Sequence, residues 1–177
     1  LQALLPLAFA EDEGAGDITS EATIDPKQRS QAVLLCKEKG ILAGSPALEA
    51  IFRYRGLAPR IEWHVEEGSA IRSGQALATL EGETRGLLLC ERIVLNFLQR
   101  FCGIATTAHT FAVALGKSKT RILDTRETLP GYRLLDKYAV AVGGGSNHRQ
   151  GLFDQVLIKD NHIAASGTAR AAAEKTA

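Results

Sequence analysis

Four cationic or ionisable side chains stand out in the C-terminal part of this 177-residue sequence: Arg126, His148, Arg149 and Lys159. Arg126 and Lys159 each follow a short apolar run, and the other two lie between them. Arginine binds carboxylates and phosphates with paired hydrogen bonds, and lysine adds a compact charge. A site built from these side chains would suit a small ligand that carries several negative charges.

The elements around these residues predict βα geometry. Apolar runs at 122–123 and 156–158 end abruptly in polar residues, which is typical of buried strands, and candidate helices follow at 132–140 and 168–176. In parallel α/β proteins, chemistry collects where strands give way to loops at their C-terminal ends. We therefore expect the four side chains to share one site.

Several motifs carry a resemblance to a known family. The segments DTRETLPGYR, KYAV, GGGSNHRQGL and IKDNH follow one another, and EDEGAGDIT, GILAG and ERIVLNFLQRFCGIAT stand upstream. Together they resemble the nicotinate-nucleotide pyrophosphorylases, also called quinolinate phosphoribosyltransferases, over nearly the whole chain. The pattern GGGxNHR followed by IKDNH is the most specific part of this resemblance.

The resemblance implies a reaction and a set of site residues. Quinolinate would be joined to the ribose of phosphoribosyl pyrophosphate, with loss of pyrophosphate and carbon dioxide, to give nicotinate mononucleotide for NAD biosynthesis. The residues implied to bind substrate are Arg92, Arg126, Glu127, His148, Arg149 and Lys159, with Lys159 also catalytic. Arg92 would reach into a neighbouring subunit, which implies a homodimer or higher oligomer with sites shared between subunits. Mg2+ would accompany the pyrophosphate, with the family's carboxylate ligands beyond Ala177.

Glu127 departs from the family pattern, which has lysine at this position. An anion there would repel bound carboxylates or phosphates, or it would pair with Arg126 or Arg149 and occupy the anion site itself. Either outcome leaves a rival function open: a catalytically impaired homologue that binds anions or regulates a partner.

The fold class expected is α/β. The order of elements predicts an N-terminal α+β sandwich domain at 1–104, and the resemblance implies that the first βα units of a TIM-like barrel follow at 105–177, truncated at the C-terminus. The N-terminal strands are expected at 32–37, 41–44, 61–65, 70–71 and 76–80, with a helix at 46–54.

Two helices are expected between these parts. The first covers 91–101, because Val94, Phe97, Leu98 and Phe101 make one apolar face, and Gly103 would end it; the second covers 106–115. Arg92 then lies in a first turn, where the helix dipole does not favour a cation. That position suggests a role for Arg92 outside the helix.

Composition excludes other classes of function. A net charge of +1 gives no basic excess for nucleic acid or a membrane surface, and no apolar stretch approaches a membrane span. The cysteines at 36, 90 and 102 lie in apolar runs, which fits reduced thiols and a cytoplasmic location.

A zinc site from His148, Asp160 and His162, as in a metal-dependent hydrolase, lacks the usual spacing. A biotinyl-type carrier is excluded, since no lysine occurs at 61–89.

Overall fold

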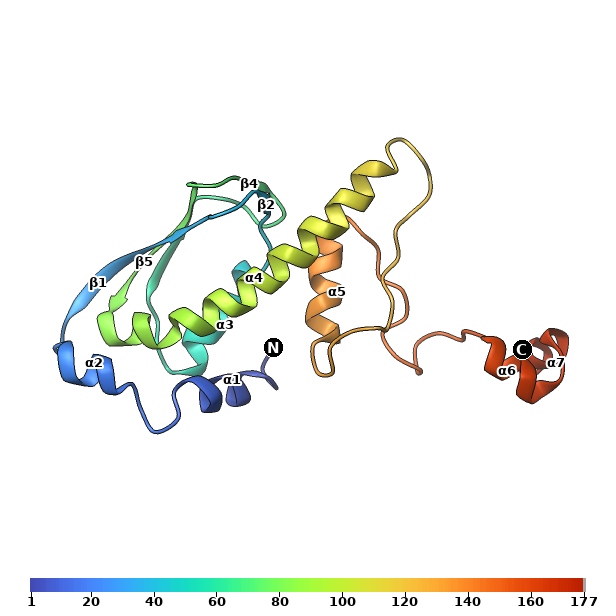
Figure 1. The fold of residues 1–177 in the computed structure, drawn as a ribbon, viewed down its shortest axis with the longest axis horizontal. Coiled ribbons are helices and arrows are strands. Elements are labelled where there is room, and N and C mark those ends of the chain that lie inside the picture. Colours follow the sequence, from blue (N-terminus) through green and yellow to red (C-terminus); the bar gives the residue numbers. More distant parts are fainter. Residues whose placement is uncertain (177) are drawn as a thin grey trace.

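The computed structural model describes residues 1–176 as an elongated molecule with three regions along its length (Figure 1). A sheet with surrounding helices forms one end, a helix pair and two long loops form the middle, and two short helices form the other end. The elements in chain order are α1 (Leu5–Asp12), α2 (Ile18–Thr23), β1 (Arg29–Leu35), β2 (Gly40–Ile41), α3 (Ser45–Tyr54), β3 (Arg60–Trp63), β4 (Ala70–Ile71), β5 (Ala76–Glu83), α4 (Thr84–Ala114), α5 (Arg133–Val142), α6 (Asp160–Ser166) and α7 (Ala169–Glu174).

The N-terminal region contains strands and helices, as the sequence predicted, and its strands pair antiparallel. β5 is central, with β1 on one side and β3 on the other, while β2 and β4 form a separate two-stranded pair. Leu80 of β5 stands opposite Ala32 of β1 and Ile61 of β3. Leu80 is buried, so this register sets an apolar face of the sheet toward the helices.

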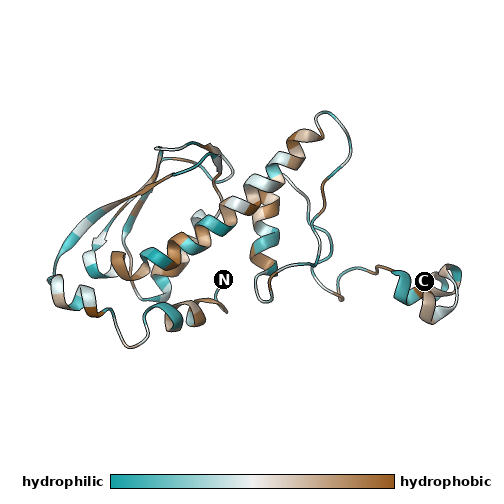
Figure 2. Ribbon diagram, in the orientation of Figure 1, coloured by the Kyte–Doolittle hydropathy of each residue, from teal (hydrophilic) through white to brown (hydrophobic). Residues whose placement is uncertain are grey.

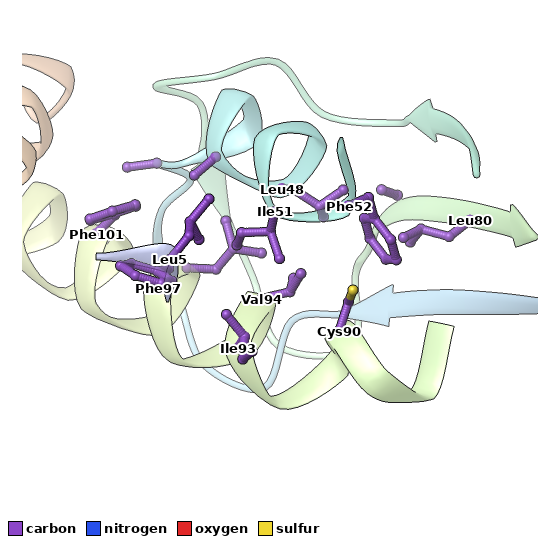
Figure 3. Close-up of a cluster of buried hydrophobic side chains, with 14 of the residues drawn as sticks. Leu5, Leu48, Ile51, Phe52, Leu80, Cys90, Ile93, Val94, Phe97 and Phe101 are labelled. Atoms are coloured by element: carbon purple, nitrogen blue, oxygen red, sulfur yellow. The ribbon is translucent and has the colours of Figure 1, made fainter. Parts of the chain in front are cut away.

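The main core lies between this sheet and helices α1, α3 and α4. Figure 3 shows Leu48, Ile51 and Phe52 of α3 facing Cys90, Ile93 and Val94 of α4, with Leu5 of α1 beside them. Each of these side chains is at most 5% exposed. The apolar face predicted for residues 94–101 is therefore confirmed as a core face.

Helix α4 corrects the expectation of two helices. It runs unbroken for 31 residues through Gly103, where an added Cβ would meet no atom within 4 Å. A glycine inside a helix costs only about 1 kcal/mol, which packing on both sides can offset. Thr106 and Thr107, expected to cap a new helix, instead donate their hydroxyls to the carbonyls of Cys102 and Gly103 at 2.6 and 2.9 Å.

Helix α5 confirms the helix predicted at 132–140 and packs closely on the second half of α4. A Cβ at Gly143 would lie 2.2 Å from the carbonyl oxygen of Ala105, so only glycine permits this approach. Arg100 of α4 donates two hydrogen bonds to Asp136 of α5, at 2.8 and 2.7 Å. The expected boundary at 104/105 falls inside α4, which carries the connection between the two regions.

The two C-terminal strands predicted from apolar runs are wrong. Residues 122–123 contribute only an isolated parallel bridge between Leu123 and Ser146, and residues 156–158 form no strand. Val156 is 65% exposed, and the apolar stretch lies in an extended segment leading to α6 (Figures 1 and 2). A parallel strand needs hydrogen-bonding neighbours and helical cover, and residues 1–176 place neither beside this segment.

The C-terminal helices are α6, which the sequence did not predict, and α7, which lies within the predicted 168–176. Thr168 accepts a hydrogen bond from the Ala171 amide at 3.0 Å and so caps α7. Both helices stand apart from the rest of the molecule (Figure 1).

Cys36 and Cys90 are buried, Cys102 is half-buried, and all three are free thiols. Within residues 1–176, every helix is too short or too polar to cross a bilayer.

Candidate anion-binding site

Two loops meet in the middle of the molecule and carry four of the predicted site residues: Arg126, Glu127, His148 and Arg149. The Asp124 amide donates to the carbonyl of Ser146 at 3.0 Å, and the Ser146 amide donates to the carbonyl of Ile122 at 2.8 Å. These two bonds form the parallel bridge and set the loop that begins at Asp124 beside the loop that begins at Ser146. Arg126 lies on the first loop, and His148 and Arg149 lie on the second.

Arg133, in the first turn of α5, ties the same two loops together from another side. Its guanidinium donates to the carbonyl of Arg126 at 3.3 Å, to the carbonyl of Gln150 at 3.2 Å and to the Thr128 hydroxyl at 3.2 Å. A turn at Pro130–Gly131 leads into α5, with Gly131 at φ 82°. The backbones that carry Arg126 and Arg149 are therefore fixed relative to each other.

The two arginines on these loops keep hydrogen-bond donors free. Arg126 is half-buried, and its Nε atom is fully buried without a hydrogen-bond partner among residues 1–176. Arg149 is only 7% exposed, and its Nη1 donates to the carbonyl of Gln155 at 3.3 Å. A guanidinium has five N–H donors, so most of those on Arg149 stay available. A buried donor without a partner, such as Arg126 Nε, is costly, which favours an anionic ligand at this place.

His148 is held by its backbone. Its amide donates to Asp124 Oδ1 at 2.7 Å, and its carbonyl accepts from Lys137 Nζ at 3.0 Å. Asp124 and Lys137 also form an ion pair whose side chains are 7% and 2% exposed. Sequence reasoning missed both residues, and also Arg133, because a charged residue in a helix or loop usually faces solvent. The available signal was their position inside the DTRETLPGYR and KYAV motifs.

Glu127 and Lys159 lie at the exposed edge of this region. A hydrogen bond with the side chain of Thr125, and to a smaller extent the positive charge of Lys159, lower the pKa of Glu127. Among residues 1–176, Glu127 forms no ion pair with Arg126 or Arg149, so the expectation that it could occupy the anion site by pairing with one of them is wrong. The structure places Lys159 directly before α6, where its amide donates to Nδ1 of His162 at 3.0 Å.

The glycine run at 143–145 serves helix packing. Gly143 lies against α4, and a Cβ at Gly145 would lie 2.7 Å from the side chain of Val140. Gly144 has φ 91°, a left-handed conformation that glycine adopts without strain. These contacts and the backbone conformation of Gly144 account for the three consecutive glycines, so a role in phosphate binding is not needed to explain them.

Arg92 is not brought to the other site residues within one chain. Because α4 begins at Thr84, Arg92 lies in its third turn, and the argument from an unfavourable helix end is wrong. Its side chain is exposed, and no hydrogen bond within residues 1–176 links it to the two loops. Leu88, one turn earlier, is 43% exposed.

The side chains considered for zinc do not assemble. The His162 ring accepts a hydrogen bond from the Lys159 amide at the N-terminus of α6. His148 lies on the second arginine loop, where its amide donates to Asp124. Within residues 1–176, no three His, Cys, Asp or Glu side chains converge as a metal site.

Comparison with known proteins gives a consistent family. The family model for the quinolinate phosphoribosyl transferase N-terminal domain matches residues 17–102, and the model for the C-terminal domain of the same family matches residues 104–177. A quinolinate phosphoribosyltransferase (decarboxylating) of Nicotiana tabacum is 45% identical over 168 residues, which are 94% of this chain and 47% of that relative. A probable nicotinate-nucleotide pyrophosphorylase (carboxylating) of Bacillus subtilis is 42% identical over 99% of this chain and 60% of its own length.

The fold agrees with the same comparison. The crystal structure of NadC from Streptococcus pyogenes superposes with a TM-score of 0.94 at 37% identity, covering 99% of this chain and 62% of that one. The mixed α/β class predicted from the sequence is thus confirmed. The chain spans about half the length of the curated plant relatives it matches.

Proposed function

Because this chain belongs to the quinolinate phosphoribosyltransferase family, we propose that it takes part in the transfer of phosphoribose from phosphoribosyl pyrophosphate to quinolinate. The products would be nicotinate mononucleotide, pyrophosphate and carbon dioxide. The relatives that match carry the names of this reaction, decarboxylating or carboxylating according to the direction in which it is written.

One observation carries the proposal: two buried or half-buried guanidiniums, Arg126 and Arg149, lie on loops that are fixed together and keep donors free. Quinolinate is a pyridine dicarboxylate and its co-substrate is a polyphosphate, so both need such donors. Departure of pyrophosphate leaves a cation-like sugar, and fixed positive groups stabilise the leaving charge without reorganising. His148 adds a ring beside Arg149, and Lys159 is proposed to supply a further charge at the exposed edge.

The test is quinolinate binding and turnover by the purified protein. We expect quinolinate to bind by calorimetry and to be converted, in the presence of phosphoribosyl pyrophosphate and magnesium, to nicotinate mononucleotide. Nicotinate, which lacks the second carboxylate, is the matched control ligand and should bind much more weakly. Arg149→Met should remove quinolinate binding. Equal binding of quinolinate and nicotinate would contradict the proposal.

A homodimer with a shared site is part of this proposal. Arg92 is exposed on α4, away from the two loops of its own chain, and exposed Leu88 lies on the same face. We propose that this face contacts a second copy and that Arg92 completes the partner's anion site. Mixing Arg92→Ala with Arg149→Ala subunits should restore one intact site per dimer. No recovery of binding in the mixture, with mixed dimers confirmed by mass, would refute the shared site.

Magnesium and cellular location follow as minor parts of the proposal. Magnesium would be bound mainly through oxygens of the pyrophosphate group, since it keeps few protein ligands in phosphate sites. The three free thiols support a reducing compartment such as the cytoplasm.

A further inference from the structure

The buried ion pair of Lys137 and Asp124 has no place in the binding chemistry proposed above. Lys137 is one of the largest fully buried side chains in the described part of the chain, with 2% of its side chain exposed. Taking two charges out of water costs several kcal/mol per ion, and a well-packed apolar pair is often equally stable. A charged pair at a buried position therefore suggests a role other than stability.

The contacts of this pair converge on one peptide segment. Lys137 Nζ donates to Asp124 Oδ1 and to the carbonyl of His148, while the His148 amide donates to the same Asp124 oxygen. The Asn147 amide group, in the orientation that satisfies its neighbours, donates to Asp124 Oδ2 at 2.8 Å and to the carbonyl of Lys137 at 2.9 Å. The backbone is therefore held on both sides of His148, immediately before Arg149.

Asp124 also begins the loop that carries Arg126, two residues later. The carboxylate thus links the first arginine loop to the second, and Lys137 attaches both to α5. Its positive charge also neutralises Asp124, the carboxylate that links the two arginine loops. Removing Lys137 would free the His148 carbonyl and leave a buried negative charge near the ligand.

We propose that Lys137 and Asp124 are positioning residues that fix His148 and Arg149 relative to Arg126 for anion binding. They act through the His148 backbone and contact no substrate. This inference rests on the proposed function for the identity of the anion, but the placement of the loop can be tested without it.

The experiment compares Lys137→Met with Arg100→Met. The second variant breaks the neighbouring pair with Asp136, which joins the same helix to α4. Within residues 1–176, Arg100 forms no hydrogen bond with either loop, and its guanidinium also contacts the ring of Tyr132 at the N-cap of α5. Hydrogen exchange of the His148 amide is measured by NMR, relative to core amides of α4. We expect exchange at His148 to accelerate at least tenfold in Lys137→Met and to stay at the wild-type rate, after correction for global stability, in Arg100→Met.

Quinolinate affinity, corrected for the folded fraction, is the second readout. Lys137→Met should bind at least tenfold more weakly than the wild type, and Arg100→Met within about twofold of it. Unchanged exchange at His148, or equal losses of affinity in both variants, would overturn the positioning role. If the wild type binds no quinolinate, the proposed function fails and the exchange rates alone decide the inference.

Discussion

Removing the Glu67 carboxylate should destabilise the protein at the junction between its N-terminal and middle regions. This half-buried side chain accepts hydrogen bonds from the amides of Gly44 and Ser45 at 2.7 and 3.0 Å, from the Ser45 hydroxyl at 2.5 Å and from the Tyr138 hydroxyl. The first three bonds satisfy the N-terminus of α3, and the last one reaches α5.

The magnitude follows from the groups that lose a partner. Gly44 is buried, so its amide in Glu67→Ala would lack both a protein acceptor and water, at a cost of about 1–3 kcal/mol. Loss of a helix N-terminal acceptor adds about 1 kcal/mol. Allowing for the partial exposure of the carboxylate, we expect a total of about 3 kcal/mol. In a chain of this length, that lowers Tm by roughly 6–12 °C.

The effect of Glu67 should also depend on pH. Burial alone raises the pKa of this carboxyl, but the hydrogen bonds from Ser45, Tyr138 and the Gly44 amide outweigh it, so the pKa in the folded protein lies below its ordinary value of 4.5. Burial, together with the hydrogen bond to Glu67, raises the pKa of Tyr138. A lowered carboxyl pKa adds stability above the unfolded pKa and loses it as pH falls through the folded pKa. The Tm difference between wild type and Glu67→Ala should therefore be constant near neutrality and narrow below about pH 4.5.

Thermal melts of matched variants test this reasoning. Glu66→Ala, an exposed neighbour, should change the free energy of unfolding by less than about 0.5 kcal/mol. Tyr138→Phe should cost about 1.5–2 kcal/mol, and the double variant with Glu67→Ala should cost less than the sum, because both lose one shared bond. A surface change shifts Tm by roughly 1–2 °C in a chain of this length. If the Tm of Glu67→Ala lies within that range of the Tm of Glu66→Ala, the carboxylate does not hold the two regions together.

Further variants probe helix packing, thiol burial and the exposed edge of the site. Gly143→Ala should lower the free energy of unfolding, measured in urea melts, by about 2 kcal/mol or more, because its Cβ would lie 2.2 Å from a carbonyl oxygen of α4. Gly103→Ala, whose Cβ would meet no atom within 4 Å, should raise the free energy of unfolding by about 0.5–1 kcal/mol. Burial raises the pKa of Cys90 to about 12, so iodoacetamide at pH 8 should modify this thiol only after the protein unfolds. Mass spectrometry would detect the modification, and labelling of Cys90 in the folded protein would contradict its burial. Glu127→Lys should strengthen quinolinate binding several-fold with Tm unchanged, since an anion near the ligand becomes a cation; equal affinity in calorimetry would show that the side chain points away. Lys159→Ala should weaken quinolinate or phosphoribosyl pyrophosphate binding without a change in Tm, and unchanged affinity for both would remove this lysine from the site.

Local patterns were sufficient for most of the N-terminal region. The strand at 76–80 and the helix at 46–54 were predicted from alternation and helical spacing, since each buries an apolar face against its neighbours. Prediction failed where local and tertiary signals disagree. Gly103 is a local helix breaker, but packing on either side keeps α4 continuous. The run at 156–158 is apolar enough for a strand, but a strand exists only with a partner.

The site was predicted in part for a related physical reason. Arg126 was recognised because it follows an apolar run that was predicted to be a strand, and Arg149 because it adjoins His148 in the loop that follows. That Arg126 and Arg149 bind one ligand stays a prediction. The residues that hold their loops were missed, because their partners are distant in the sequence: 13 positions separate Lys137 from Asp124. A charged residue has no local mark that distinguishes a buried pair from a solvated one.

Helix α5 shows what such distant pairs accomplish together. Three consecutive residues contact three different parts of the molecule: Asp136 bonds to α4, Lys137 to the two arginine loops and Tyr138 to Glu67 near α3. Successive residues on a helix point about 100° apart, so one turn can attach α5 in three directions. Lys137 thus attaches the arginine loops to α5, while Asp136 and Tyr138 attach the same helix to α4 and to Glu67, which explains why a charged DKY sequence occupies the interior of an otherwise amphipathic helix.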